Sequence, residues 1–284
     1  MADGILRHGR LGMGTWCLGD RPETRSEEIA ALRYGLEQGI TIIDTAELYG
    51  GGRSERLVGE AVKPFAREEI YLVSKVLPAN AGRRRLEQSL DASLKALQTD
   101  YLDMYLYHWR GSTPLQETVD ALEAAAAKGK IKSWGVSNFD LEDMQELLED
   151  TDGGGRCRTN QVLYHLGSRG IEVVLKPYQD ERGIPTMAYC PLAQAGGLRS
   201  GLIDSPAVRQ VAQEQGVSGC QVLLCFALAQ ENMVSIPRTG KLAHMKELAA
   251  CLQIKLSDEQ LALLNRAFPV PERRVPLDVE ERSV

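Results

Sequence analysis

The chain has 284 residues, of which 43% are hydrophobic and 25% charged, as is ordinary for a soluble globular protein. Its net charge of -6 offers no basic surface for nucleic acid or anionic lipid, so we expect neither as a partner. The opening stretch MADGILRHGRLG has no apolar core of signal-peptide length, and no segment reaches the roughly 18 apolar residues of a membrane span. We therefore expect a cytoplasmic protein.

The six cysteines and four histidines do not show the spacing of a metal site. No C-x-x-C, H-x-H or H-E-x-x-H occurs, and the cysteines lie too far apart in sequence for a compact disulfide framework. We expect reduced thiols and no bound metal.

Short apolar runs alternate with segments of helical periodicity along the whole chain. The pattern predicts strands at 11–15, 40–43, 70–75, 101–107, 131–136, 159–162, 183–189 and 234–237. Between them, apolar residues recur at helical spacing, with Ser26 expected to cap the first helix and a capping box expected at Ser257. A helix is predicted over about 168–182, and a long glycine-rich loop over 191–206.

The predicted strands begin at intervals close to thirty residues, except for the longer last interval. The chain therefore has eight strand–helix units. Such regularity, at a length near the roughly 250 residues typical of the fold, predicts an α/β protein with a (β/α)8 TIM barrel. A doubly wound sheet is the alternative, but the chain lacks the glycine-rich phosphate turn expected after its first strand. We expect a single barrel domain over residues 1–284, with a loop-like tail from about 269.

Four polar side chains fall at the ends of consecutive predicted strands. Asp44 and Tyr49 follow the second strand, Lys75 ends the third, and His108 follows the fourth. Each residue alone also has an ordinary interpretation. Asp44 could be a turn residue, Tyr49 a loop aromatic, Lys75 a solvated strand end and His108 a core histidine. In a barrel, however, these strand ends meet at the face where catalytic residues lie. The three glycines at 50–52 would let the chain turn after Tyr49.

The set has the chemistry of a proton donor for carbonyl reduction. A phenol normally titrates near 10, and an adjacent ammonium lowers that value toward neutrality. Asp44 would hold Lys75 charged, and His108 would orient the substrate oxygen. Glycoside hydrolysis is less well supported, because Asp44 has no acidic partner among the four.

Seven strings resemble the aldo-keto reductases over nearly the whole chain: IIDTAELYG, VSKV, LYHW, WGVSNF, NQV, YCPL and IPRT. The resemblance implies a (β/α)8 barrel and NADPH-dependent reduction of aldehydes or ketones. It makes Tyr49 the general acid, supported by Asp44, Lys75 and His108. The stretches DYLDMYLYHWRGS and NQVLYHLGSRGIE, with AYCPLAQAG, are similar to the bacterial branch that includes methylglyoxal reductases.

The resemblance also implies a cofactor site, with Ser137, Asn138 and Gln161 at the nicotinamide carboxamide and Tyr189 stacked on its ring. The remaining cofactor residues implied are Thr15, Trp16, Leu192, Gln194, Arg238, Thr239, His244 and Glu247. His244 stands where many members have arginine, and Leu248 replaces the usual asparagine, so NADPH is expected with NADH as the alternative.

The substrate pocket is expected to be formed by Trp16, Tyr49, His108 and Trp109, with Tyr107 as a further wall residue. A short charged tail suggests an open pocket for small aldehydes and 2-oxoaldehydes. The expected partner is thus a small carbonyl compound, bound by a monomer or weak homo-oligomer. A cofactor-binding sensor or regulatory subunit with little turnover is the alternative function, which the complete four-residue set disfavours.

Overall fold

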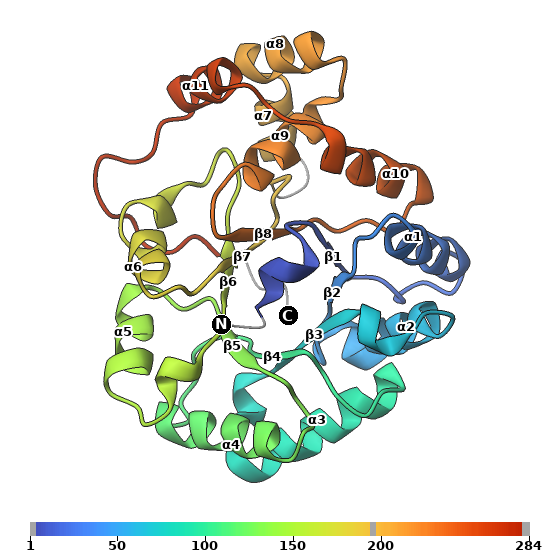
Figure 1. Cartoon of the computed structure of the whole chain (residues 1–284), viewed down its shortest axis with the longest axis vertical. Helices are drawn as coiled ribbons and strands as arrows, with labels where there is room; N and C mark the ends of the chain where they lie inside the picture. Colours follow the sequence, from blue (N-terminus) through green and yellow to red (C-terminus); the bar gives the residue numbers. More distant parts are fainter. Residues whose placement is uncertain (1–3, 194–196, 280–284) are drawn as a thin grey trace.

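Eight parallel strands form the centre of the computed structural model, which describes residues 4–193 and 197–279 (Figure 1). They are β1 (Gly12–Gly14), β2 (Ile42–Asp44), β3 (Tyr71–Val76), β4 (Met104–Tyr107), β5 (Trp134–Ser137), β6 (Asn160–Leu163), β7 (Thr186–Tyr189) and β8 (Met233–Ile236). Each strand pairs with its neighbours in chain order. Bridges from Leu11 to Ser235 and from Gly14 to Arg238 close the sheet. The predicted (β/α)8 barrel is confirmed.

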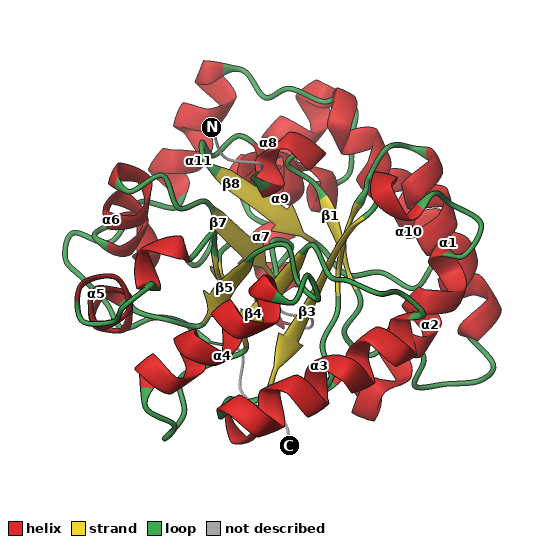
Figure 2. Ribbon diagram, turned by 60° about the horizontal axis from the view of Figure 1, so that its bottom comes forward, coloured by secondary structure: helices red, strands yellow, loops and turns green. Residues whose placement is uncertain are grey.

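Helices surround the strands on the outside (Figure 2). They are α1 (Arg25–Glu37), α2 (Arg53–Val62), α3 (Arg83–Leu97), α4 (Leu115–Ala127), α5 (Leu141–Glu149), α6 (Leu175–Glu181), α7 (Gly197–Ile203), α8 (Pro206–Gln215), α9 (Gly219–Leu228), α10 (Leu242–Ala250) and α11 (Asp258–Ala267). Within the described ranges, no helix combines the length and apolar character needed to cross a membrane.

Two apolar clusters follow from the alternation of side chains along each strand. Tyr71 and Val73 of β3 belong to the cluster inside the barrel, whereas Leu72 and Val76 belong to the larger cluster between strands and helices. A 3-10 helix, η1 (Ile5–His8), also contributes an apolar side chain to the inner cluster. By the same alternation, Lys75 points inward.

Several predicted boundaries are wrong. Ser26 does not cap α1, because the helix already begins at Arg25; Thr24 is its N-cap residue, and the Thr24 hydroxyl donates to Glu28. The predicted helix over 168–182 is a 3-10 turn at Gly170–Glu172 followed by the shorter α6.

The predicted loop over 191–206 contains α7, which buries Leu202 in the core. At the other end of the chain, the capping box at Ser257 is confirmed, with reciprocal bonds to Gln260. The tail contains no helix or strand over its described part, 269–279.

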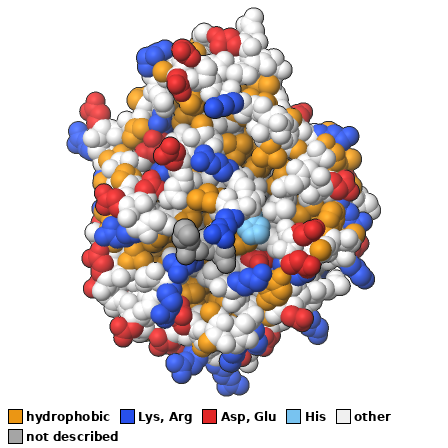
Figure 3. All heavy atoms as spheres, viewed as in Figure 1, with side chains coloured by type: hydrophobic (Ala, Val, Ile, Leu, Met, Phe, Trp, Pro, Cys, Tyr) orange, Lys and Arg blue, Asp and Glu red, His pale blue; other side chains and the backbone are white. Residues whose placement is uncertain are grey.

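Acidic and basic side chains are interspersed over the face seen in Figure 3. Both signs of charge are mixed there, as on the surface of an ordinary globular protein.

Candidate active site

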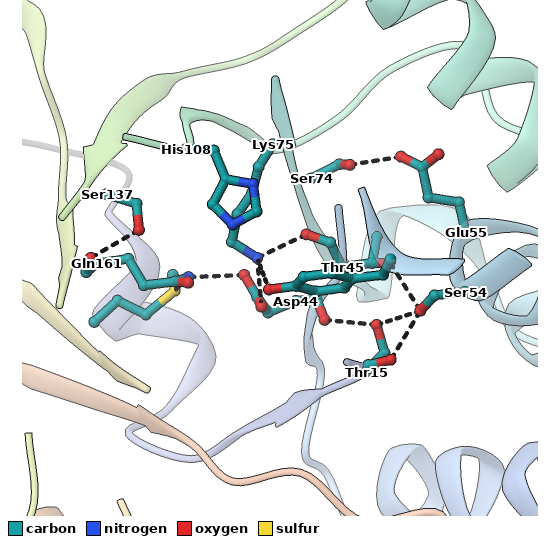
Figure 4. A network of polar contacts seen from close by, with 12 residues as sticks. Thr15, Asp44, Thr45, Ser54, Glu55, Ser74, Lys75, His108, Ser137 and Gln161 are labelled. Atoms are coloured by element: carbon teal, nitrogen blue, oxygen red, sulfur yellow. Dashed lines mark hydrogen bonds and ion pairs between the residues drawn. The ribbon is translucent and has the colours of Figure 1, made fainter. Parts of the chain in front are cut away.

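A buried ion pair at the carboxyl ends of β2 and β3 organises the site (Figure 4). Nζ of Lys75 donates to Oδ2 of Asp44 at 2.7 Å, to the carbonyl oxygen of Thr45 at 2.8 Å and to the hydroxyl of Tyr49 at 3.1 Å. An ammonium has three protons, so these acceptors use its full donor capacity and fix its direction. The side chains of Lys75 and Asp44 are 0% and 3% exposed.

Burial and the carboxylate act in opposite directions on this lysine. Removal from water lowers the pKa of Lys75, while the charge of Asp44 and its hydrogen bond raise it. Asp44 thus offsets part of the desolvation penalty of the ammonium. A buried charge without such a partner would be strongly unfavourable.

The three glycines after Tyr49 all adopt a left-handed backbone. Gly50, Gly51 and Gly52 have φ values of 58°, 59° and 82° in the 3-10 turn η2 (Tyr49–Gly52). Side chains at these angles would be strained. The turn directs the Tyr49 hydroxyl back to Lys75 before α2 begins.

His108 completes the predicted group of four. Its ring lies edge-on to that of Tyr49, with ring centroids 5.9 Å apart. The ring of Trp109, the next residue along the chain, has its centroid 4.7 Å from that of His108. The structure thus brings Asp44, Tyr49, Lys75 and His108 together, from three consecutive strand ends.

A second polar cluster lies at the ends of β5, β6 and β7. The hydroxyl of Tyr189 donates to Oδ1 of Asn138 at 2.8 Å, and Nδ2 of Asn138 donates to the carbonyl oxygen of His108 at 3.1 Å. Oγ of Ser137 donates to the carbonyl oxygen of Gln161 at 2.9 Å. Asn138 has a φ of 58°, a left-handed conformation that asparagine tolerates better than most residues. Amides, a hydroxyl and an aromatic ring gathered at one point fit a flat ring that carries a carboxamide.

Gln161 connects this amide cluster to the ion pair. Its Nε2 donates to Oδ1 of Asp44 at 2.7 Å, so both oxygens of that carboxylate are hydrogen-bonded. No local sequence signal predicts this bond, because 117 positions separate the two residues.

One of the expected cofactor residues, Leu192, lies just after β7. The carbonyl oxygen of Leu192 accepts a hydrogen bond from Nε of Arg199 at 2.8 Å. Gln194, by contrast, lies outside the described residues.

The residues expected at the adenosine end follow β8. Nε of Arg238 donates to the carbonyl oxygen of Trp16 at 2.8 Å, and the adjacent Thr239 is buried. His244 and Glu247 are exposed on α10. Leu248, which replaces the family's usual asparagine, is instead buried in the core.

Thr15 is fully buried beneath the site. Its hydroxyl donates to the carbonyl oxygen of Asp44 at 2.9 Å and accepts from Ser54 at 2.8 Å. The hydroxyl of Thr45 in turn donates to Ser54 at 3.1 Å. This chain of hydroxyls supports the end of β2 from below (Figure 4). The hydroxyl of Thr15 thus already has hydrogen-bond partners within the protein, namely Asp44 and Ser54.

The expected pocket-wall residues differ in exposure. Trp16 is 46% exposed, and Trp109 is half-buried at the end of β4. Leu48 precedes Tyr49 in the chain and is 45% exposed, although no motif in the sequence marks it as a site residue.

The expectation that Tyr107 forms part of the wall is wrong. Tyr107 is fully buried, packs against Phe139 and accepts a hydrogen bond from the backbone N–H of Gly111. It belongs to the apolar cluster between strands and helices, because it alternates with the inward positions of β4.

Glu55 is a buried acidic residue that no motif in the sequence marks as part of the site. It lies in the first turn of α2 and accepts a 2.6 Å hydrogen bond from Ser74. Its spacing from Val58 and Val62 places it on the apolar face of the helix, which is the signal that marks it as buried.

The fold and this group of side chains define a (β/α)8-barrel enzyme with its polar site at the carboxyl ends of the strands. Residues 10–268 match the model of the aldo/keto reductase family, and the chain belongs to that family.

Among its relatives is the methylglyoxal reductase YeaE of Escherichia coli, which is 48% identical over 95% of this chain and 94% of that protein. A crystal structure of an aldo/keto reductase from Klebsiella pneumoniae with NADP and acetate is 48% identical and covers 95% of each chain, with a TM-score of 0.93. A second, from Klebsiella pneumoniae with NADPH, is 46% identical, covers 99% of this chain and 100% of that one, and also has a TM-score of 0.93.

Proposed function

We propose that the protein reduces small aldehydes and 2-oxoaldehydes, such as methylglyoxal, to alcohols with NADPH, and that Tyr49 is the general acid. The observation that carries the proposal is the 3.1 Å contact between Nζ of Lys75 and the hydroxyl of Tyr49 beside a buried ion pair. The similarity to a methylglyoxal reductase and to structures with NADP and NADPH supports the substrate and the cofactor.

The residues of the ion pair have complementary roles in proton transfer. As the carbonyl carbon gains hydride, its oxygen gains a proton from the Tyr49 hydroxyl, which leaves a phenolate. The ammonium of Lys75, 3.1 Å from that oxygen, stabilises the phenolate by about 5 kcal/mol at an effective dielectric of 20. Asp44 keeps Lys75 charged, although its own charge cancels part of this stabilisation. His108, whose ring contacts that of Tyr49, would orient the substrate oxygen.

The chain's own residues fit a nicotinamide dinucleotide. When bound, the nicotinamide supplies the hydride. Ser137, Asn138 and Gln161 would hold its carboxamide, and Tyr189 would pack against its ring.

The rest of the cofactor would follow the ends of β7, β8 and β1. Leu192 would lie along the diphosphate, and the exposed Trp16 would lie beside the nicotinamide end together with the backbone of Thr15. The adenosine end would meet the residues that follow β8, of which Arg238 is the group suited to a 2'-phosphate because it is permanently charged. The others in that group are Thr239, His244 and Glu247.

The position of the tail supports a pocket open to small substrates. Arg274 pairs with Asp140 at 3.2 Å, and Ser168 donates to Asp278 at 2.9 Å, so the described part of the tail is held beside β5 and β6. These strands lie across the barrel from β1 and β2, which precede Trp16 and Tyr49. The described tail thus leaves Trp16 accessible.

We also propose that the enzyme acts in the cytoplasm. Cys157, Cys220, Cys225 and Cys251 are free thiols in the part of the chain that the structure describes, as expected in a reducing compartment.

The test is a panel of carbonyl substrates, with turnover followed by the loss of NADPH absorbance. We expect the highest kcat/KM with small 2-oxoaldehydes and a preference for NADPH over NADH. Faster turnover of bulky steroid ketones would contradict the substrate class, and preferential use of NADH would contradict the cofactor. Tight NADPH binding without turnover of any carbonyl would instead favour a sensor.

A further inference from the structure

We propose that Gln161 is a positioning residue of the proton donor, because its amide fixes the orientation of the Asp44 carboxylate. The inference rests on the proposed function, since it assigns Tyr49 as the proton donor. It adds a role that is separate from any contact of Gln161 with a cofactor.

The bond between Gln161 and Asp44 crosses the interior of the barrel. β2 and β6 are four strands apart in an eight-stranded barrel, so their inward side chains face each other. Gln161 and Asp44 are each only 2% exposed. Nε2 of Gln161 lies 2.7 Å from Oδ1 of Asp44 and 2.7 Å from Sδ of Met187. The side chain is thus held between a carboxylate and a packed methionine.

The chemistry of the two groups decides which end of the amide faces Asp44. An ionised carboxylate only accepts hydrogen bonds, so the amide nitrogen must face it. Gln161 Oε1 is then the end that remains to accept a hydrogen bond from a carboxamide. One side chain can therefore serve the cofactor through its oxygen and the proton donor through its nitrogen.

This bond determines how Asp44 meets the lysine. With Oδ1 held by Gln161, only Oδ2 is presented to Lys75, and the ammonium keeps its third proton for Tyr49. Without the amide, Oδ1 would be a buried acceptor with no partner, which is unfavourable. The carboxylate could then rotate and bind Lys75 through both oxygens, drawing the ammonium away from the phenol.

Gln161 is itself anchored in the amide cluster. Its backbone carbonyl accepts bonds from Oγ of Ser137 and from the backbone N–H of Asn138, both at 2.9 Å. The same strand end therefore holds the residues that would meet the nicotinamide and the amide that holds Asp44. Alignment of the proton donor is thus built into the barrel itself and does not depend on the cofactor.

The test compares Gln161→Met with Ser137→Ala in cofactor-free protein. Methionine keeps the length of the side chain but cannot donate to Asp44, whereas Ser137 belongs to the same cluster and bonds to the Gln161 backbone instead. Ionisation of Tyr49 is measured by tyrosinate absorbance, with the same variant carrying Tyr49→Phe subtracted. We expect Gln161→Met to raise the ionisation midpoint of Tyr49 by about one pH unit, a tenfold change in its equilibrium. Ser137→Ala should leave it unchanged and weaken NADPH binding.

An unchanged Tyr49 midpoint in a folded Gln161→Met protein would overturn the proposal and leave Gln161 as a cofactor contact only. Because this titration needs neither cofactor nor substrate, its result is independent of whether the proposed carbonyl reduction is found. Circular dichroism and the urea midpoint check that the variant is folded.

Gln161→Glu is a second variant that preserves the shape of the side chain. When protonated, the introduced carboxyl can still donate to Asp44, whereas its ionised form repels that carboxylate. We expect the pH profile of kcat/KM to gain an ionisation, with activity lost as the introduced carboxyl deprotonates. A profile identical to that of the unmodified protein would contradict the positioning role.

Discussion

Oγ of Ser74 donates a 2.6 Å hydrogen bond to the carboxylate of Glu55. Ser74 immediately precedes Lys75 in β3. Ser74 points to the helix layer, while Lys75 points into the barrel. The bond therefore joins the first turn of α2 to β3. Glu47 makes a second connection, because its carboxylate accepts from the backbone N–H of Leu77 at 2.6 Å. The turn that contains the proposed proton donor is held to β3 from both sides.

The buried carboxyl of Glu55 should make stability depend on pH. Burial raises the pKa of Glu55 above its ordinary value of 4.5, against the opposing effect of its bond to Ser74. A raised pKa means that the folded state binds the proton more tightly than the unfolded state. This contribution to stability is complete below the unfolded pKa and is lost as the pH rises through the folded pKa.

Glu55→Gln should therefore lose this pH dependence, because the amide is neutral at every pH and still accepts from Ser74. We expect the variant to gain stability relative to the unmodified protein as the pH rises above 4.5 toward the raised value. Urea unfolding across about pH 4 to 8 measures the difference. Parallel curves for the two proteins would show that Glu55 keeps an ordinary pKa.

Tyr49→Phe keeps the aromatic ring but removes the proposed proton donor, whose hydroxyl is also one of the three acceptors of Lys75. Loss of a general acid typically reduces the rate by about 10²- to 10⁴-fold. We expect a fall in kcat of that size with small aldehydes, with NADPH affinity preserved, because the amide cluster does not include the Tyr49 hydroxyl. Cofactor fluorescence measures the binding. Retention of most of the activity would remove Tyr49 from the proposed mechanism.

Lys75→Met should lower the free energy of unfolding by more than the loss of side-chain packing alone would. Asp44 would then carry a buried charge without its cation, and breaking such a pair costs about 3–5 kcal/mol of unfolding free energy. The double variant Lys75→Met with Asp44→Asn removes the charge and retains an oxygen that accepts from Gln161. We expect it to recover part of the loss in urea unfolding. A double variant less stable than Lys75→Met would argue against the charge as the cause.

Gly59→Ala should destabilise the protein although alanine is the better helix former. A Cβ at Gly59 in α2 would lie 2.8 Å from the carbonyl oxygens of both Ala96 and Leu97 on α3, and backbone cannot move aside easily. Gly201 in α7 is the matched control, since a Cβ there meets nothing within 4 Å. We expect Gly201→Ala to stabilise by about 0.5–1 kcal/mol and Gly59→Ala to lower the melting temperature. Equal shifts in the same direction would contradict the close packing of the two helices.

The barrel and the four side chains at its strand ends could be predicted from the amino-acid sequence alone. Short apolar runs at regular intervals are local patterns, and a closed parallel barrel brings all its carboxyl strand ends to one face. Asp44, Tyr49, Lys75 and His108 could therefore be grouped from their positions along the chain. The motifs shared with the family pointed to the same residues.

What these side chains contact depends on the three-dimensional arrangement of the strands. The bond from Gln161 to Asp44 requires closure of the barrel, which brings opposite strands within reach of one another. The burial of Tyr107 depends on which way each strand position faces, and a shift of one residue reverses that direction. The hydroxyl of Thr15 likewise forms its hydrogen bonds with Asp44 and Ser54 beneath the site. Periodicity places a residue at a strand end, but strand register and barrel closure determine its partners.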